Sequence, residues 1–186
     1  MKKIVLLTTS PTKGGNGDAL ISAAKGAACE CGGEITQIAV RDLNINPCKA
    51  CYQCRDTGIC VQSDDFAPIL AALHECDGII AEAPIYYNCM AAQALTVINR
   101  LCCTFACKSY QVGPKKRIGV MLTCTGSSVE EMKHHIQNIF DLPSIQRSVK
   151  EERTEVFTQC VEHTTCQNTE AYLERARSIA RWVCEE

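Results

Sequence analysis

The 186-residue sequence has neither an excess of basic residues nor a long apolar segment. Its formal net charge of -2 gives no electrostatic reason to expect nucleic acid or an anionic membrane surface as a partner. No apolar stretch is long enough to span a bilayer, and the N-terminus lacks the apolar core and cleavage site of a signal peptide. We therefore expect a cytoplasmic protein that binds neither nucleic acid nor membrane.

Several common motifs are also missing. There is no G-x-S-x-G or H-E-x-x-H pattern, so neither a serine hydrolase nor a zinc protease is indicated. The G-x-G-x-x-G pattern of dinucleotide sites and the G-K-[ST] ending of triphosphate loops are absent too. No linker or low-complexity segment divides the chain, and 46% of its residues are hydrophobic, so residues 1–186 are expected to form a single domain.

Cysteine, by contrast, is abundant. The chain has 15, an odd number that prevents complete pairing in disulfides. In a reducing cytosol such a content indicates metal binding, redox chemistry or small core residues. Exposed thiols oxidise in air, which favours a low-oxygen cytoplasm. Four cysteines lie within one short segment, residues 48–60: Cys48, Cys51, Cys54 and Cys60.

Apolar strand patterns alternate with amphipathic helical patterns along the chain. The expected strands are residues 2–9, 34–40, 77–83, 117–123 and 154–159. Two of the expected helices start near Asp18 and Ser128, and three more cover residues 66–75, 91–106 and 169–184. Residues 63–65 are expected to cap the helix 66–75. Ser128 and Glu131 are expected to form a capping box. This alternation predicts an α/β fold with a five-stranded parallel sheet of order 2-1-3-4-5. Residues 141–153 show no clear pattern.

Residues 10–18 join the first strand to the first helix and are rich in turn-forming residues. Glycines there allow backbone N–H groups to approach a phosphate, and the helix N-terminus adds partial positive charge. Ser10, Thr12 and Asn16 add side-chain donors. Because the dinucleotide and triphosphate patterns are absent, the phosphate of FMN fits this loop best; a plain turn between strand and helix is the alternative.

Other loops are expected to meet this one. In a sheet of the predicted order, ligands bind beyond the carboxyl ends of the strands, between strands one and three. The loop 84–90 after the third strand offers Tyr86 and Tyr87 to stack on a flavin ring and Asn88 to bond its pyrimidine edge. The Thr125-Gly126 loop and the cysteine segment open on the same edge. Their convergence predicts a ligand site, with an aromatic cap over the sheet edge as the alternative.

These patterns carry a family resemblance. Three patterns carry it: S-P-x-K-G-G-N from Ser10, C-x2-C-x2-C-x5-C followed by Asp64-Asp65, and P-x-Y with a downstream Asn99-Arg100. In these three patterns the chain resembles the iron-sulfur flavoprotein branch of the NAD(P)H-dependent FMN reductases, in the flavodoxin superfamily. The resemblance covers roughly residues 3–126. It implies a flavodoxin-like three-layer sandwich, bound FMN, and homodimers or tetramers that complete the flavin site across an interface.

Two sets of site residues follow from the resemblance. The cofactor set is expected to hold FMN: Ser10, Thr12, Lys13, Asn16, Gly17, Asp18, Pro84, Ile85, Tyr86, Tyr87, Asn88, Thr125 and Gly126. The metal set is expected to hold a [4Fe-4S] cluster: Cys48, Cys51, Cys54 and Cys60. From ligand type and spacing alone, structural zinc and free or redox-active thiols are alternatives.

Four positions depart from the family pattern. They are Thr12, where arginine is frequent, Gly17, where a hydroxyl residue is usual, Asn88, where glycine is common, and Thr96, where lysine is common. The missing charge and hydroxyl near the phosphate predict weaker retention of FMN, since charge-assisted hydrogen bonds are the stronger kind.

The expected function is that of an FMN-dependent oxidoreductase. It would pass electrons from NAD(P)H or ferredoxin through FMN and a [4Fe-4S] cluster to a small acceptor. The cofactor carries the chemistry, so no side chain is assigned as a catalytic acid or base. The alternatives are a cluster-free NAD(P)H-dependent FMN or quinone reductase and a non-enzymatic, flavodoxin-like electron carrier, which would oxidise NAD(P)H slowly.

Overall fold

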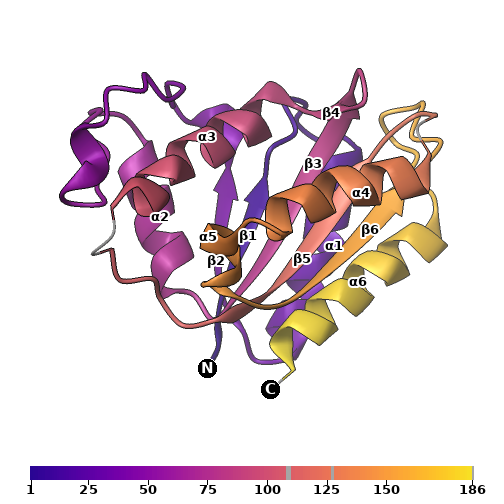
Figure 1. Ribbon diagram of the computed structural model, residues 1–186. Helices are drawn as coiled ribbons and strands as arrows, with labels where there is room; N and C mark the ends of the chain where they lie inside the picture. The colour runs from indigo at the N-terminus through magenta and orange to yellow at the C-terminus, as the bar shows by residue number, and fades with distance from the viewer. Residues whose placement is uncertain (108–109, 127, 186) are drawn as a thin grey trace.

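Five parallel strands form the centre of the molecule in a computed structural model that describes residues 1–107, 110–126 and 128–185 (Figure 1). These strands are β1 (Lys3–Thr8), β2 (Glu34–Ala39), β3 (Gly78–Tyr86), β5 (Lys116–Thr123) and β6 (Val149–Phe157). Their order is β2-β1-β3-β5-β6, and each neighbouring pair is parallel. The predicted 2-1-3-4-5 order and the flavodoxin-like α/β fold are confirmed.

Helices cover both faces of the sheet (Figure 1). The layer on one face consists of α1 (Asn16–Glu30) and α6 (Glu170–Cys184). The layer on the other consists of α2 (Phe66–Glu75), α3 (Ala92–Ala106) and α4 (Val129–Phe140). Three short helices are η1 (Val40–Asp42), η2 (Gln53–Arg55) and α5 (Pro143–Gln146). In the part of the chain that the structure describes, no helix has both the length and the apolar character needed to cross a membrane.

Strand β1 shows why its sequence is apolar without alternation. Ile4 and Leu6 pack against α1 and α6, whereas Val5 and Leu7 pack against α2 and α3. All four side chains are buried, and each contributes about 1.5–3 kcal/mol by leaving water. The strand therefore lies between two helical layers, as a central strand of a parallel sheet does.

The helix starts agree with the sequence only in part. Helix α2 spans the predicted residues, but the carboxylate of its N-cap residue, Asp65, makes no capping bond and instead accepts from the N–H of Asn44 at 2.7 Å. Asp64 supplies the bond, accepting from the N–H of Phe66 at 3.2 Å. At the start of α4, the hydroxyl of Ser128 accepts from the N–H of Glu131, as half of the expected capping box.

Strand β3 runs further than the sequence predicts. We expected it to stop before Pro84, but it continues to Tyr86 and turns back through β4 (Cys89–Met90) in an antiparallel pair. The turn residues Tyr87 and Asn88 have φ of 50° and 56°, the signs found in a type I′ hairpin turn. Pro84 is tolerated in β3 because the pairing of β3 with β1 ends at Glu82. The missing N–H of Pro84 therefore removes no hydrogen bond between these two strands.

The segment without a pattern holds α5 and the first half of β6. Strand β6 starts at Val149 rather than 154 and ends at Phe157, because Gln159 adopts a left-handed conformation with φ 55°. Its early residues are charged since β6 lies at the sheet edge and pairs with β5 alone. One of them, Glu151, accepts from Arg117 at 2.9 Å. Because edge strands often carry charged residues, the first half of β6 lacks the alternating apolar pattern from which a strand is predicted.

Candidate functional site

The loop between β1 and α1 has the geometry of an anion cradle. Gly15 occupies the N-cap position of α1, and no side chain caps the helix there. The N–H groups of the first helical turn, from Asn16 on, therefore have no intrahelical partners. Gly14, with φ 71°, makes the turn that precedes them. Unpaired donors combined with the helix dipole favour a bound anion.

Arg41, from η1, holds the cradle in shape. Its guanidinium donates to both carboxylate oxygens of Asp18, at 2.9 and 3.0 Å, and approaches the carbonyl oxygen of Ser10 at 3.4 Å. The same Asp18 carboxylate accepts from the N–H of Gly14 at 2.7 Å. The structure thus gives Asp18, assigned to the cofactor set, a role in shaping the loop, and adds Arg41, which the sequence did not single out.

A fully buried carboxyl group lies directly beneath the cradle. Glu82, on β3, is 0% exposed and accepts from the hydroxyl of Thr8 at 2.8 Å. A Cβ atom at Gly17 would lie 2.5 Å from this carboxyl group, so any other residue there would force the carboxyl group to shift. Burial raises the pKa of Glu82 to about 7, against the hydrogen bond from Thr8. Among the described residues, its Oε1 has no hydrogen-bond partner.

A cavity of about 470 Å³ opens over the cradle at the carboxyl ends of β1, β3 and β5, a size typical of small-molecule sites. Nine residues of the predicted cofactor set line it: Ser10, Thr12, Asn16, Gly17, Pro84, Ile85, Tyr86, Tyr87 and Thr125. The other four, Lys13, Asp18, Asn88 and Gly126, are not in its wall. The convergence of three predicted loops on one cavity agrees with the topological switch point of the sheet.

The two tyrosines of the β3–β4 hairpin are open to solvent. Tyr86 is 50% exposed and Tyr87 fully exposed. Tyr87 also occupies a left-handed turn position, which is unfavourable for a bulky residue. Stacking of these rings on a flavin stays a prediction, and their exposure leaves room for it.

The segment after β6 completes the cavity and was missed at the sequence level. Cys160, Val161, Glu162 and His163 line the wall together with Cys124. These residues carry no recognisable motif. Only the strand order could have predicted them, because β6 ends at the same sheet edge as the strands that carry the predicted loops.

Asn16 fastens this segment to the cradle. Its side-chain amide donates to the carbonyl oxygen of Glu162, and its amide oxygen accepts from the N–H of Cys166, both at 2.8 Å. The side chain expected to bond a phosphate is thus engaged with the cavity wall, while its backbone N–H remains in the first turn of α1. Asn16 therefore links the two sides of the cavity.

The cysteine segment has little regular structure. Cys48 and Cys51 are exposed, whereas Cys54 and Cys60 are half-buried. Ala50 and Tyr52 both adopt left-handed conformations. Within residues 1–107, 110–126 and 128–185, no three histidine, cysteine or acidic side chains are grouped closely enough to hold a metal. The donor atoms are of the expected type, but they do not converge on one point.

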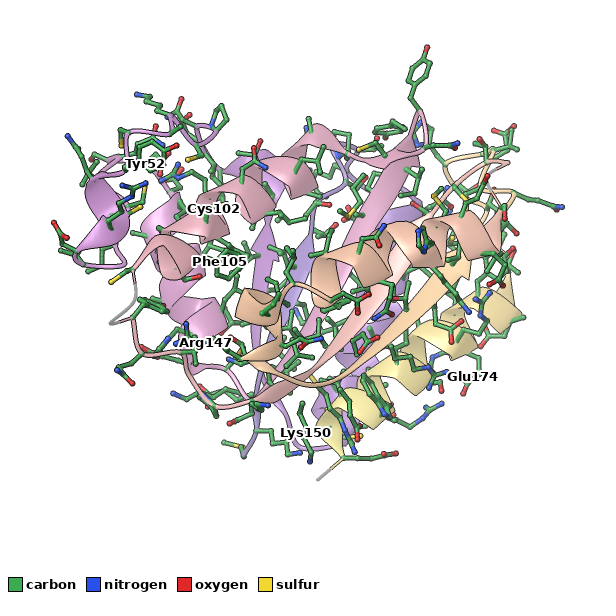
Figure 2. The ribbon with its side chains drawn as sticks, in the orientation of Figure 1. Tyr52, Cys102, Phe105, Arg147, Lys150 and Glu174 are labelled. Carbon is green, nitrogen blue, oxygen red and sulfur yellow. The ribbon has the colours of Figure 1, made fainter. Side chains whose placement is uncertain are left out.

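The segment borders α3, which contacts η2. Figure 2 shows Tyr52 of the segment and Cys102 of α3 at the same end of the molecule. Burial, together with the neighbouring thiols of Cys48 and Cys54, raises the pKa of Cys102. Additional thiols therefore lie beside the predicted metal set.

A buried ion pair anchors the cysteine segment to α3. Arg100 and Asp64 have side chains only 1% exposed and form two hydrogen bonds, at 2.5 and 3.1 Å. Arg100 also donates to the carbonyl oxygen of Asn46 at 2.7 Å and stacks over the ring of Phe66. The hydrogen bonds from Arg100 hold the pKa of Asp64 well below its usual range. These two residues belong to the quoted resemblance, and the structure gives them a structural role.

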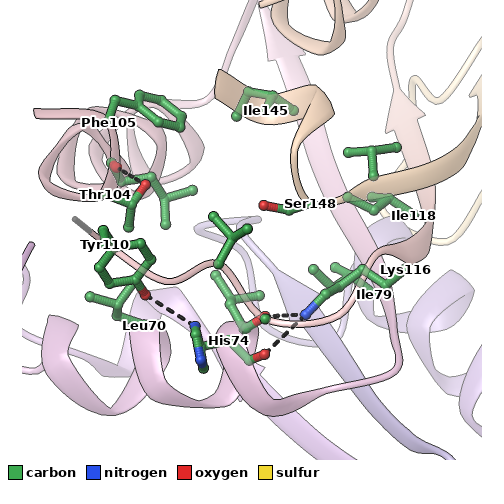
Figure 3. Close-up of a pocket in the computed structure, with 15 residues that line it drawn as sticks. Leu70, His74, Ile79, Thr104, Phe105, Tyr110, Lys116, Ile118, Ile145 and Ser148 are labelled. Carbon is green, nitrogen blue, oxygen red and sulfur yellow. Dashed lines mark hydrogen bonds between the residues drawn. The ribbon is translucent and has the colours of Figure 1, made fainter. Parts of the chain in front are cut away.

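A second cavity, of about 130 Å³, lies between α2, α3 and α5 and is mainly apolar (Figure 3). The hydroxyl of Tyr110 and Nδ1 of His74 are 3.2 Å apart in its wall. The buried ammonium of Lys116 donates to the last carbonyls of α2, at Leu73 and His74, a favourable position for a cation. No predicted site residue lines this cavity, and its polar groups stabilise the end of α2.

Sequence comparison identifies relatives of the chain. Residues 2–150 match the model of a family described as NADPH-dependent FMN reductase. An iron-sulfur flavoprotein of Methanosarcina thermophila is 33% identical over 139 residues, which are 75% of this chain and 71% of that protein. An iron-sulfur flavoprotein of Methanocaldococcus jannaschii is 35% identical over 98 residues, which are 53% of this chain and 51% of that protein. The match to this second relative thus spans about half of its length.

Solved structures share the fold. An NAD(P)H:quinone oxidoreductase from Methanothermobacter marburgensis has a TM-score of 0.75 at 13% identity, covering 100% of this chain and 98% of that chain. An apo NADH:FMN oxidoreductase has a TM-score of 0.64 at 14% identity, covering 99% of this chain and 89% of that chain. At such identities the likeness concerns the fold. With the sequence matches, it shows that the chain belongs to the NADPH-dependent FMN reductase family, with iron-sulfur flavoproteins among its relatives, and is an FMN-dependent oxidoreductase.

Proposed function

We propose that this oxidoreductase binds FMN in the cavity over the cradle and passes electrons from NAD(P)H or ferredoxin to a small acceptor. The observation that carries the proposal is the uncapped N-terminus of α1 in a cavity at the switch between β1 and β3. The first-turn N–H groups of α1 would bind the phosphate. Bound FMN would supply the chemistry, because it can accept a hydride and release electrons singly.

The protein residues bind and orient. Arg41 and Asp18 fix the loop so that its donors need not reorganise when an anion arrives. Glu82 beneath Gly17 would repel a phosphate if ionised, but burial raises its pKa to about 7 and so favours its neutral form below neutral pH. The chain would therefore hold a phosphate mainly with backbone donors, because no lysine or arginine is among the described residues that line the cavity.

We also propose that Cys48, Cys51, Cys54 and Cys60 hold a [4Fe-4S] cluster. Four thiols with this spacing are the ligand type that such clusters take, and relatives of the chain are named iron-sulfur flavoproteins. The cluster would supply one-electron transfer. Ligand binding would have to draw Cys48 and Cys51 in from their exposed positions.

A cluster-free FMN or quinone reductase is the second candidate. It is favoured by the absence of any metal-holding arrangement among the described residues. In that case the segment 48–60 would carry free thiols, and electrons would pass from the flavin to the acceptor directly.

A homodimer or tetramer is part of the proposal. Tyr86 and Tyr87 are large, exposed aromatic side chains at the cavity rim, and aromatic residues are enriched in protein interfaces. Light scattering of wild type and Tyr87→Ser tests this. An oligomer that the substitution weakens is expected, and a monomeric wild type would contradict it.

The variant Cys51→Ala separates the two candidate functions. Because Cys51 is exposed, we expect the variant to keep its fold and FMN but lose its iron and transfer single electrons to an added acceptor more slowly. Iron content, flavin content and anaerobic stopped-flow reduction of a one-electron acceptor by the NADPH-reduced protein measure these properties. Cys29→Ala, another exposed cysteine, is the control. Unchanged iron content in Cys51→Ala would contradict the ligand assignment.

A further inference from the structure

Two cysteines outside the 48–60 segment lie in contact at the wall of the cofactor cavity. The Sγ atoms of Cys160 and Cys166 are 3.6 Å apart. Cys160 is half-buried and lines the cavity, whereas Cys166 is 0% exposed. Cys160 is therefore the member of the pair at the wall of the space that a cofactor or small molecule would enter, and Cys166 is in contact with it in the core.

The geometry suits disulfide formation. Bonded sulfurs are about 2.05 Å apart, so closure requires the two atoms to approach by roughly 1.5 Å. Between the cysteines the chain forms turns rather than a strand or long helix, and turns adjust more easily than regular elements. Donation from the thiol of Cys166 lowers the pKa of Cys160, and the same contact raises the pKa of Cys166. Cys160, the half-buried residue at the cavity wall, is thus the one favoured as the attacking thiolate.

The pair is mechanically connected to the cradle. Asn16, the first residue of α1, accepts from the N–H of Cys166 and donates to the carbonyl oxygen of Glu162. Both partners belong to the segment that a disulfide would tighten. Closure of the bond would therefore shift the cavity wall or break these contacts with the start of α1.

We propose that Cys160 and Cys166 form a reversible disulfide by exchange with a small-molecule disulfide that enters the cofactor cavity, and that the disulfide form binds FMN more weakly. The identity of the cavity's occupant rests on the proposed function. Because coupling between two sites is reciprocal, bound FMN would also disfavour formation of the disulfide.

The exchange proceeds in two balanced steps. The Cys160 thiolate attacks one sulfur of the small disulfide, forming a mixed disulfide and releasing one small thiolate. The Cys166 thiol gives up its proton as its sulfur attacks Cys160, forming the protein disulfide and releasing the second thiolate. The two protons lost by Cys160 and Cys166 pass through water to the two released thiolates. The protein dithiol is oxidised by two electrons, and the small disulfide is reduced to two thiols.

Trypsin provides a direct readout. Thr154 to Arg175 contains no internal lysine or arginine, and its only cysteines are Cys160 and Cys166. The reduced full-length protein, freed of FMN, is equilibrated without oxygen in buffers of increasing oxidised-to-reduced glutathione ratio, trapped with N-ethylmaleimide and digested. As the ratio rises, the peptide carrying two maleimides should be replaced by one that carries none. The second peptide should lack two hydrogens relative to the unmodified dithiol peptide, as a disulfide does. Two maleimides at every ratio, or glutathione remaining on Cys160, would overturn the proposal.

Variants identify the roles of the two thiols. Cys160→Ser should abolish attack within this peptide, whereas Cys166→Ser should accumulate glutathione on Cys160 because the second thiol is missing. Cys29→Ser, at an exposed site remote from the pair, should behave like wild type. Cys166 is in the core, so Cys166→Ser could fail to fold. In that case Cys160→Ser alone tests whether Cys160 is the attacking thiol.

Binding of FMN tests the coupling. We expect the disulfide form to bind FMN about tenfold more weakly than the dithiol form in a fluorescence titration. Saturating FMN should then require a glutathione couple about 30 mV more oxidising for the same conversion. Equal affinities would overturn the coupling. Failure of the dithiol form to bind FMN would contradict the proposed function instead, and the peptide measurement would still decide whether the disulfide forms.

Discussion

The cradle after β1 and the cysteine segment 48–60 are both loops at the carboxyl edge of the sheet, but the core supports them differently (Figure 1). The cradle is bonded to β3 through Thr9, to η1 through Arg41 and to the segment after β6 through Asn16. The cysteine segment is fixed mainly near its ends, where Arg100 contacts Asn46 and Asp64.

This difference indicates what each loop needs. The cradle is preorganised by the folded chain, so binding of a phosphate there would order little backbone. The cysteines have suitable donor atoms but exposed positions, so a bound metal group would have to supply the energy that brings them together. The two sites are therefore expected to respond differently when their supporting residues are changed.

The largest effect is expected at the anchor of the cysteine segment. Asp64→Ala leaves the guanidinium of Arg100 buried without its carboxylate, which should lower the free energy of unfolding by about 3–5 kcal/mol. Urea denaturation measures the change. Asp56→Ala, at an exposed position of the same segment, should change stability by less than about 0.5 kcal/mol. If the two variants were equally stable, the anchor would not support this region.

The carboxyl group beneath the cradle predicts a pH dependence. Its pKa is about 7 in the folded protein and 4.5 ordinarily, so between these values the folded chain keeps a proton that the unfolded chain has released. Stability should therefore fall as pH rises from 4.5 to 7, by about 3 kcal/mol for this group, and then level off. Desolvation is the main cause, with Asp18 and Arg41 acting in opposite directions.

The variant Glu82→Gln isolates that contribution. It should match wild type near pH 4 and exceed its unfolding free energy by about 3 kcal/mol at pH 8. Glu34→Gln, at an exposed site, should follow wild type at both values. A constant difference between Glu82→Gln and wild type across this range would contradict a buried group that titrates.

Two glycines of α1 provide a matched pair for testing the cradle. Gly17→Ala would place a Cβ 2.5 Å from the carboxyl group of Glu82, costing about 1–3 kcal/mol and weakening FMN binding. Gly26→Ala meets nothing within 4 Å and should stabilise the helix by about 0.5–1 kcal/mol. Thermal unfolding and FMN titration measure both. Equal behaviour of the two variants would show that the start of α1 is not closely packed.

The smallest predicted effect concerns the link across the cavity. Asn16→Ala removes the contacts with Glu162 and Cys166 and should weaken FMN binding about tenfold, the equivalent of about 1.4 kcal/mol. Lys25→Ala, on the exposed side of the same helix, should bind FMN like wild type. Unaltered affinity in Asn16→Ala would exclude a role of this side chain in cofactor binding.

Much of the fold could be predicted because its signals are local. The apolar runs of β1, β3 and β5 and the helical stripe of α2 identify buried elements without tertiary information. The loops that line the cavity follow from strand order, since carboxyl ends of parallel strands meet at one edge. The charged edge strand β6 and the hairpin turn at Tyr87 and Asn88 are different. Their structure depends on pairing with β5 and β4, which overrides local preference.

The parts of the site that sequence reasoning missed depend on long-range contacts. Cys160 to His163 reach the cavity through Asn16, nearly the whole chain away in sequence. Arg41 was missed because its partner Asp18 is on another element. The anchoring role of Arg100 likewise depends on the packing of α3 beside the cysteine segment, which places Arg100 next to Asp64.

We propose that this chain holds both a flavin and an iron-sulfur cluster. The decisive measurement is the ultraviolet-visible spectrum of protein purified without oxygen, together with iron, acid-labile sulfide and flavin assays. We expect flavin bands over broad absorption near 400 nm and about four irons per chain, as a cluster with four cysteine ligands requires. Flavin without iron or sulfide would contradict the cluster, and a protein that neither contains nor binds flavin would contradict both proposed cofactors.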